Sequence, residues 1–255
     1  MLTLTDSHCH IFKEYYDNVD NIISNARSNC VNKMIVNATN QDNFLEVMDL
    51  SKKYKEVYAA IGFQPEDLNS DTEKHLNEIE EYISEIVAIG EIGLDYYNEF
   101  SPRDLQIFIF EKEMELAERY NKPVIIHTRD AFDDTLNIIK KYPSVKGVIH
   151  CFTGSLIEAN EYIKLGYKLG IGGIVTFKKS SLIDVVREIG IENIVLETDS
   201  PYLAPTPKRG KANEPSYLFF TAKFLSEKLN VSLEELSNAT ENNIKQIFDI
   251  WFLLC

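Results

Sequence analysis

The sequence alternates eight times between a short apolar segment rich in β-branched residues and a longer segment whose apolar residues recur at helical spacing. The apolar segments span residues 4–10, 33–38, 57–63, 86–97, 123–128, 145–152, 167–173 and 193–203. Eight strand–helix alternations with short connections predict a parallel sheet with crossover helices, and eight strands close a barrel. We therefore expect an α/β fold, a (β/α)8 TIM barrel, with residues 1–255 forming one domain. A doubly wound open sheet is disfavoured, because no GxGxxG motif follows any of these segments.

Composition excludes several classes of function. The chain carries a net charge of −14 and has a sequence pI near 4.8, which argues against broad electrostatic binding of duplex nucleic acid. The four cysteines show no CxxC spacing, so we expect reduced thiols rather than disulfides. No apolar run is long enough to span a membrane, and no signal peptide is evident. The expected protein is cytoplasmic, has no membrane partner and is taken to be a monomer.

The first apolar segment, LTDSHCH, carries two of the five histidines. In an extended strand every second side chain points to the same face, so His8 and His10 would face one side together and Cys9 the other. In a helix the same two histidines would point apart and could not share an ion. The spacing therefore favours a metal site if this segment is a strand.

Further polar residues end later strands of the predicted barrel. These residues are Glu91, His127, His150 and Asp199, in the fourth, fifth, sixth and eighth segments. Active sites of such barrels lie at the carboxyl ends of the strands, so the six side chains should converge. Six ligands exceed what one catalytic zinc takes from a protein, which predicts two divalent ions with Glu91 as the bridge. His75 lies in a charged helical segment and receives no chemistry.

The chain resembles the TatD family of metal-dependent deoxyribonucleases from about Thr3 to Asp249. The motifs that carry the resemblance are DSHCH, GEIGLDYY, PVIIHTRDA, GVIHCFTGS, LETDSPYLAP, RGKANEP and TENNIKQIF. The resemblance implies a TIM barrel of the metallo-dependent hydrolase superfamily that cleaves DNA or another phosphodiester. It also implies that His8 and His10 bind one metal, Glu91 bridges two, and His127 and His150 bind the second. Asp199 would bind metal and accept the proton of the attacking water. Together with this family resemblance, the donor types leave Mg, Mn or Zn as the expected ions.

Other motif positions have less defined roles. Arg129 either meets substrate phosphate or pairs with a neighbouring acid. Asp95 is expected to anchor a ligand from beneath. Where many relatives read His-Pro-His after the third strand, this chain has Gln64, Pro65 and Glu66; a glutamine can donate a hydrogen bond to phosphate but cannot transfer a proton. Activity could therefore be weaker or directed elsewhere.

The only basic run in this acidic chain is PKRGK at 207–211, preceded by Lys178 and Lys179. It is either a solvated loop or a contact to substrate phosphate through residues such as Lys211.

Two other functions stay open. One is metal-dependent hydrolysis of an ester or amide, for example release of a D-amino acid from tRNA. The other, of a different class, is a non-catalytic metal-binding or nucleic-acid-binding protein.

Overall fold

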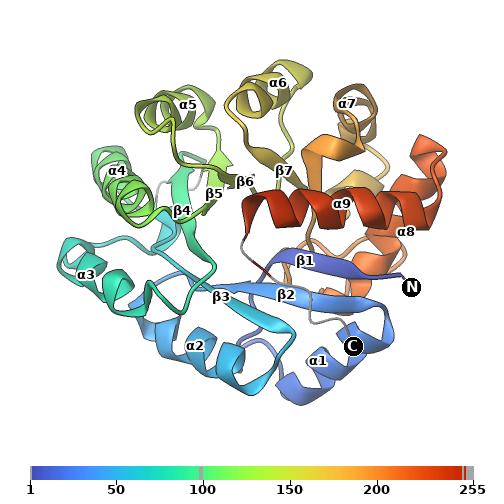
Figure 1. Ribbon diagram of the computed structural model, residues 1–255, viewed down its shortest axis with the longest axis horizontal. Helices are drawn as coiled ribbons and strands as arrows, with labels where there is room; N and C mark the ends of the chain where they lie inside the picture. Colours follow the sequence, from blue (N-terminus) through green and yellow to red (C-terminus); the bar gives the residue numbers. More distant parts are fainter. Residues whose placement is uncertain (1, 98–99, 249, 251–255) are drawn as a thin grey trace.

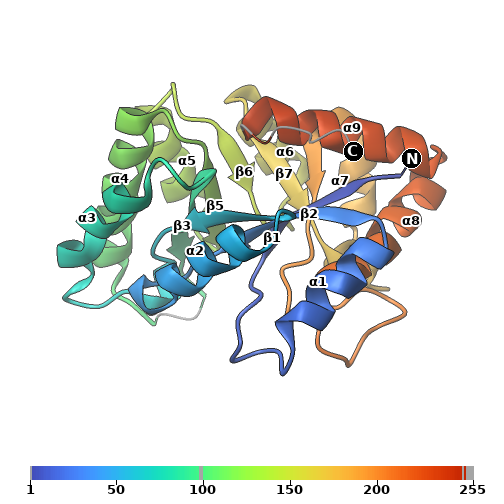
Figure 2. The ribbon, with the colours of Figure 1, turned by 60° about the horizontal axis from the view of Figure 1, so that its bottom comes forward.

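The computed structural model describes residues 2–97, 100–248 and 250. Within this part of the chain, eight parallel strands alternate with helices that pack outside them (Figures 1 and 2). The strands are β1 (Leu4–Cys9), β2 (Val31–Asn37), β3 (Val57–Ile61), β4 (Ala88–Asp95), β5 (Val124–Arg129), β6 (Gly147–Ile149), β7 (Lys168–Ile171) and β8 (Ile194–Leu196). The α-helices are α1 (Val19–Ser28), α2 (Phe44–Lys53), α3 (Thr72–Tyr82), α4 (Arg103–Tyr120), α5 (Phe132–Lys141), α6 (Leu156–Lys164), α7 (Leu182–Ile189), α8 (Leu218–Leu229) and α9 (Leu233–Ile247).

The strands follow one another around the sheet in chain order, from β1 to β8. The circle is closed beyond the end of β8, where Cys9 and Ser200 form an isolated parallel bridge. The amide of His10 donates to the carbonyl of Ser200 at 2.8 Å, and the amide of Asp199 donates to the carbonyl of His8 at 2.9 Å. The predicted α/β barrel is confirmed.

The interior of the barrel has an apolar floor. One buried side chain from each of six strands forms it: Ile35, Ala60, Ala88, Ile125, Val148 and Val195. Helix α9 crosses this end of the barrel (Figure 1). Ile244 of the helix and Phe248, which directly follows it, cover the floor. The larger apolar core lies between the strands and the surrounding helices. The described residues thus cover this end of the barrel, and a ligand is expected at the opposite end, where the strands end and the β–α loops begin.

Several strand boundaries differ from those expected. The fourth strand was expected to end near Glu91 but runs to Asp95, and the fifth continues past His127 to Arg129. The eighth is shorter than its apolar segment and ends at Leu196, so Asp199 lies in the following loop. The apolar tail at 251–255 lies outside the described residues. Among the described helices, none has the length and apolarity needed to cross a bilayer.

Candidate metal centre

The strand period of two places most of the polar residues directly above the apolar floor. His127 follows Ile125 by two residues, and His150 follows Val148 by two. Because alternate side chains share a face, both histidines point into the barrel one layer closer to its open end.

Strand β8 extends the same pattern. Glu197 and Asp199 follow Val195 at intervals of two, although the ladder has already ended at Leu196. Asp199 has a positive φ of 55°, a conformation that aspartate tolerates better than most residues. Its backbone amide is held by the His8 carbonyl, so the barrel closure itself positions this carboxylate.

Glu91 breaks this pattern, because it lies three residues after the interior Ala88. A register shift between β4 and β5 accounts for its direction: Gly90 pairs with Ile125 and Ile92 with Ile126, which leaves Glu91 as an extra residue. Such a bulge redirects one side chain. Two residues later, Gly93 has φ +133°, and a Cβ there would lie 2.0 Å from the His127 carbonyl oxygen. The two strands therefore approach closely beside Glu91 and His127.

The two oxygens of the Glu91 carboxylate face two different histidine pairs. Oε2 lies 3.4 Å from His8 Nε2 and 3.5 Å from His10 Nε2. Oε1 lies 3.0 Å from His127 Nδ1 and 2.9 Å from His150 Nε2. Within each pair the facing ring nitrogens are 3.1 Å apart.

Asp199 Oδ1 completes the first group. It lies 3.7 Å from His8 Nε2 and 3.8 Å from His10 Nε2. His8, His150 and Asp199 also form a third set of donors close enough to share an ion.

These spacings fit two divalent cations. Ligands about 2.1 Å from a metal are about 3.4 Å apart in a tetrahedron and about 3.0 Å apart in an octahedron. The donor-to-donor distances, from 2.9 to 3.8 Å, lie around these values. Imidazole nitrogens and carboxylate oxygens are a suitable donor set for zinc, manganese or iron. The residues present therefore fit one ion at His8, His10 and Glu91, with Asp199 close to both histidines, and a second ion at Glu91, His127 and His150.

Buried acceptors hold two of the rings in place. His127 Nε2 lies 3.0 Å from Asp95 Oδ2, and His10 Nδ1 lies 2.9 Å from the carbonyl of Asn37. Such partners fix the tautomer and orientation of a ligating histidine. Glu197 Oε1 lies 3.7 Å from His150 Nδ1, which is too far for a hydrogen bond, and His150 Nδ1 has no hydrogen-bond partner among the described residues. Glu197 occupies space left by Gly170, where a Cβ would fall 2.0 Å from its Oε2.

Burial and neighbouring charges shift the pKa values of the carboxylates and histidines in the site in different directions. Burial raises the pKa of Asp199 to about 7, and the nearby Glu91 carboxylate adds to the effect. Burial alone would raise the pKa of Glu91, but the surrounding histidines, His150 first, hold it well below its usual value. Burial would lower the pKa of His127, yet its contacts with Asp95 and Glu91 raise it to about 9. A bound cation would add positive charge and lower the pKa of every one of these groups.

A cavity of about 450 Å³ opens above this centre. His10, Glu91, His127, His150 and Asp199 line it together with Gln64, Glu66, Arg129 and Tyr202. His8 lies beneath these residues, fully buried.

Two other predicted residues, Arg129 and Lys211, lie outside the group of metal-binding candidates. The Arg129 guanidinium lies 3.8 Å from the centre of the Tyr97 ring and forms no ion pair with the described residues. The alternative of a salt bridge to a neighbouring acid is therefore not observed there. Lys211 is exposed on the loop after β8 and is not among the described residues that line the cavity.

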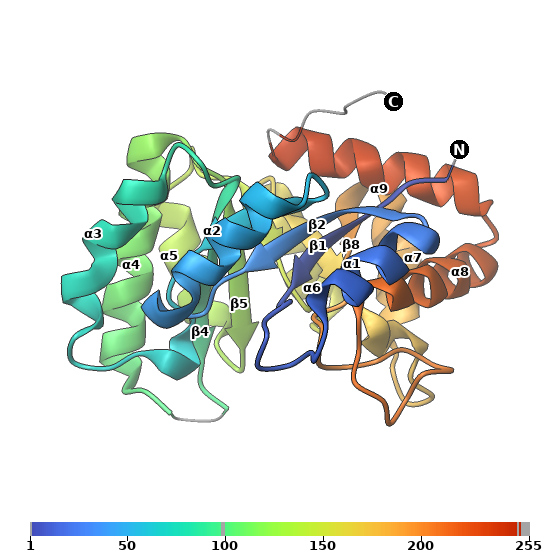
Figure 3. The same cartoon turned by 90° about the horizontal axis from the view of Figure 1, so that it is seen from below.

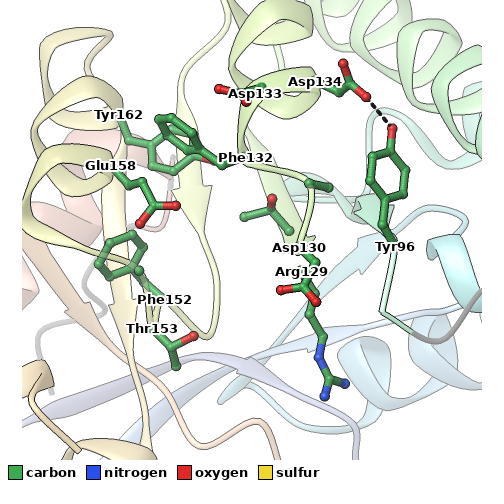
Figure 4. A pocket seen from close by; sticks show the side chains of 13 residues that line it. Tyr96, Arg129, Asp130, Phe132, Asp133, Asp134, Phe152, Thr153, Glu158 and Tyr162 are labelled. Atoms are coloured by element: carbon green, nitrogen blue, oxygen red, sulfur yellow. Dashed lines mark hydrogen bonds between the residues drawn. The ribbon is translucent and has the colours of Figure 1, made fainter.

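A second hollow of about 660 Å³ adjoins the first one and shares Thr128, Arg129 and Thr153 with it. Figure 4 shows its aromatic walls, formed by Tyr96, Phe132, Phe152 and Tyr162, and the hydrogen bond from the Tyr96 hydroxyl to Asp134. Neither this hollow nor the buried position of Glu197 beside His150 was predicted from the sequence. The only signal for Glu197 is its position two residues before Asp199 on a buried strand.

Comparison with known proteins agrees with this geometry. The family model described as TatD related DNase matches residues 5–249. The chain is 39% identical to the uncharacterized metal-dependent hydrolase YabD of Bacillus subtilis, over 97% of this chain and 99% of that protein. It is 29% identical to the human deoxyribonuclease TATDN3, over 96% of this chain and 94% of that protein.

Solved structures agree as well. The crystal structure of the TatD homologue YjjV from Escherichia coli superposes with a TM-score of 0.90 at 30% identity, covering 97% of this chain and 98% of that one. Both the family model and relatives above 30% identity extend across nearly the whole chain. The chain belongs to the TatD family of metal-dependent hydrolases.

Proposed function

We propose that this hydrolase is a two-metal phosphodiesterase that cleaves DNA, and that it acts on single strands. The observation that carries the proposal is the Glu91 carboxylate, whose two oxygens each face a separate histidine pair at 2.9 to 3.5 Å. A carboxylate shared in this way would be a ligand to both cations of a two-metal site, the kind of site that many phosphoester hydrolases use.

His8, His10 and Asp199 would hold one cation and His127 and His150 the other, with Glu91 between them. When bound, such a pair supplies Lewis acidity and a water of lowered pKa near neutral pH. Zinc and manganese suit this donor set, and magnesium is tested beside them.

The chain's own residues perform the remaining tasks. Asp199 lines the cavity, and its partly buried carboxylate would take the proton of the attacking water. Asp95 keeps the His127 ring in one orientation through the 3.0 Å contact at Nε2.

Two further side chains face the substrate space. Arg129 and Gln64 line the same cavity, and both present N–H donors suited to phosphate oxygens. Gln64 stands where a proton-transferring histidine would otherwise be expected, so Asp199 remains the single proton acceptor in this proposal.

The DNA substrate is supported by the relative named deoxyribonuclease TATDN3 and by the family model described as TatD related DNase. A single strand fits better than a duplex, because the centre lies within a cavity of about 450 Å³ bordered by β–α loops.

The test is a comparison of substrates on purified protein reconstituted with Mg, Mn or Zn. End-labelled single-stranded DNA, the matching duplex, a chromogenic phosphodiester and a chromogenic carboxylic ester are incubated in parallel. We expect hydrolysis of the single strand and of the diester, lost on chelation and restored by metal. Hydrolysis of the ester alone would refute the phosphodiesterase assignment.

A further inference from the structure

Two neighbouring β–α loops at the open end of the barrel carry a group of basic side chains. Lys178 and Lys179 lie after β7, and Lys208, Arg209 and Lys211 lie after β8. In Figure 3 the loop after β8 (orange) projects from the side of the barrel opposite α9, as does the β1–α1 loop. We call these five residues the basic loop pair.

The two loops that carry the basic loop pair contact each other directly. The amide of Thr206 donates to the Thr176 hydroxyl at 2.8 Å, which ties the loop after β8 to the loop after β7. The Arg209 guanidinium lies 3.9 Å from the centre of the Phe177 ring, so it crosses from one loop to the other.

Both loops also border the metal centre. Ile174 of the first loop and Tyr202 and Leu203 of the second line the cavity above it. Along the chain, the five basic residues therefore start a few positions after residues that line the cavity where a substrate would be cut.

The positive charge of the pair is not neutralised from within the protein. None of the five side chains forms an ion pair with a carboxylate of the described residues, whereas other surface cations such as Lys53 and Lys164 do. Lys208 instead lies 4.8 Å from the centre of the Tyr217 ring. Rings of this kind hold a cation in place without cancelling its charge.

The other two sides of the mouth are acidic. The hollow shown in Figure 4 is lined by four carboxylates, those of Asp130, Asp133, Asp134 and Glu158. A third hollow of about 480 Å³, which shares Gln64, Glu66 and Tyr202 with the central cavity, is lined by Glu14, Asp42, Glu46, Glu66 and Asp67. A polyanion would be repelled along both of these directions.

From this asymmetry we infer that single-stranded DNA held at the metal centre leaves it over the basic loop pair, with successive phosphates on Lys178, Lys179, Lys208, Arg209 and Lys211. The inference rests on the proposed function, since it takes DNA as the substrate. It explains how a chain with a net charge of −14 binds a polyanion: the attraction is confined to one sector of the mouth.

The inference sets the salt dependence of binding. Each phosphate contact to a single strand contributes about −0.7 to the slope of log K against log salt concentration. With five contacts, the Kd for a single strand should rise about 100-fold between 50 and 200 mM salt. With the two contacts that remain after removal of three charges, the rise should be only about 7-fold.

The experiment measures fluorescence anisotropy of a labelled 12-nucleotide thymidine strand, with EDTA present so that no cleavage occurs. The test variant is Lys208→Gln, Arg209→Gln and Lys211→Gln combined. The matched control removes three exposed lysines in the last turns of helices, Lys140→Gln, Lys164→Gln and Lys228→Gln. Because the helices run opposite to the strands, these control positions lie at the closed end of the barrel.

The wild type and the control should show the steep salt dependence and the test variant the shallow one. Lys178→Gln with Lys179→Gln should give an intermediate rise of about 18-fold. Equal slopes for test variant and control would overturn the inference. Thermal unfolding of each variant shows that it is folded.

Cleavage by the metal-loaded wild type is recorded separately. A wild type that cleaves no DNA would refute the proposed function, whereas equal salt slopes would refute only the path of the strand.

Discussion

Glu113, in the middle of α4, is a fully buried carboxyl group outside the metal centre. Its Oε1 accepts a hydrogen bond from the amide of Phe63 at 2.7 Å, and Oε2 has no hydrogen-bond partner among the described residues. Burial raises the pKa of Glu113 well above its ordinary value of 4.5, and the Phe63 hydrogen bond offsets only part of this rise. The side chain is therefore protonated in the folded protein at pH values where it ionises in the unfolded chain.

The sign of the pH dependence follows from this difference. A raised pKa in the folded state gives stability that is fully present below pH 4.5 and is lost as the pH rises toward the folded-state pKa. Above pH 4.5 the native state binds one more proton, so the free energy of unfolding falls by about 1.4 kcal/mol per pH unit. For a chain of this size the loss corresponds to about 3 °C in Tm per pH unit.

Glu113→Gln removes the titration and keeps an oxygen for the Phe63 amide. We expect the Tm of the variant minus that of the wild type to increase by about 3 °C per pH unit above pH 4.5, on top of any constant offset from the added N–H group. Calorimetry from pH 4 to 8 measures the difference, and Glu115→Gln, at a more exposed position on the same helix, is the control. A difference that stays flat with pH would show that Glu113 is ionised in the folded protein.

Three further predictions concern the metal centre. Asp95→Asn removes the carboxylate that orients His127, so isothermal titration calorimetry should show one of two metal-binding steps weakened about 10- to 100-fold; unchanged affinity for both ions would contradict this role. Asp199→Asn should retain most of its metal while single-turnover cleavage slows by about 10²- to 10⁴-fold, and full activity would exclude Asp199 as the proton acceptor. Chelation should lower Tm, because metal at 100 times its Kd stabilises the folded state by about 2.7 kcal/mol; a Tm indifferent to EDTA and to added Mn or Zn would argue against a metal centre.

The eightfold alternation and the period-two placement of side chains could be predicted from the sequence. His127 and His150 follow apolar strand residues by two positions, and this spacing alone indicates which way they face. The extra residue in β4 could not be predicted, because alternation from Ala88 would point Glu91 out of the barrel. Only the register against β5 reveals the bulge, and register depends on a partner strand that the local sequence does not contain.

Asp199 shows a second limit of sequence reasoning. Its place depends on the hydrogen bond from its amide to the carbonyl of His8, which links residues at opposite ends of the chain. Its residue type and its spacing from Val195 indicate a candidate ligand, but barrel closure decides where it lies. The stacking of Arg129 on Tyr97 was likewise not foreseen, because a salt bridge and a phosphate contact were the alternatives considered.

The charges of the interior connect the metal centre with the proposed strand path. Without cations, the four carboxyl groups of Glu91, Asp95, Glu197 and Asp199 outnumber the two imidazoles with raised pKa values, His127 and His150. Two neighbouring hollows are acidic as well. In the apo protein a phosphate group is therefore repelled from the centre, and the basic loop pair is left as the place where a strand can be held. Metal loading would add positive charge at the centre and so supply a contact for phosphate there. Affinity for a single strand should accordingly rise on metal binding in the wild type and in the loop variants alike, and a rise confined to the wild type would mean that the two regions do not act independently.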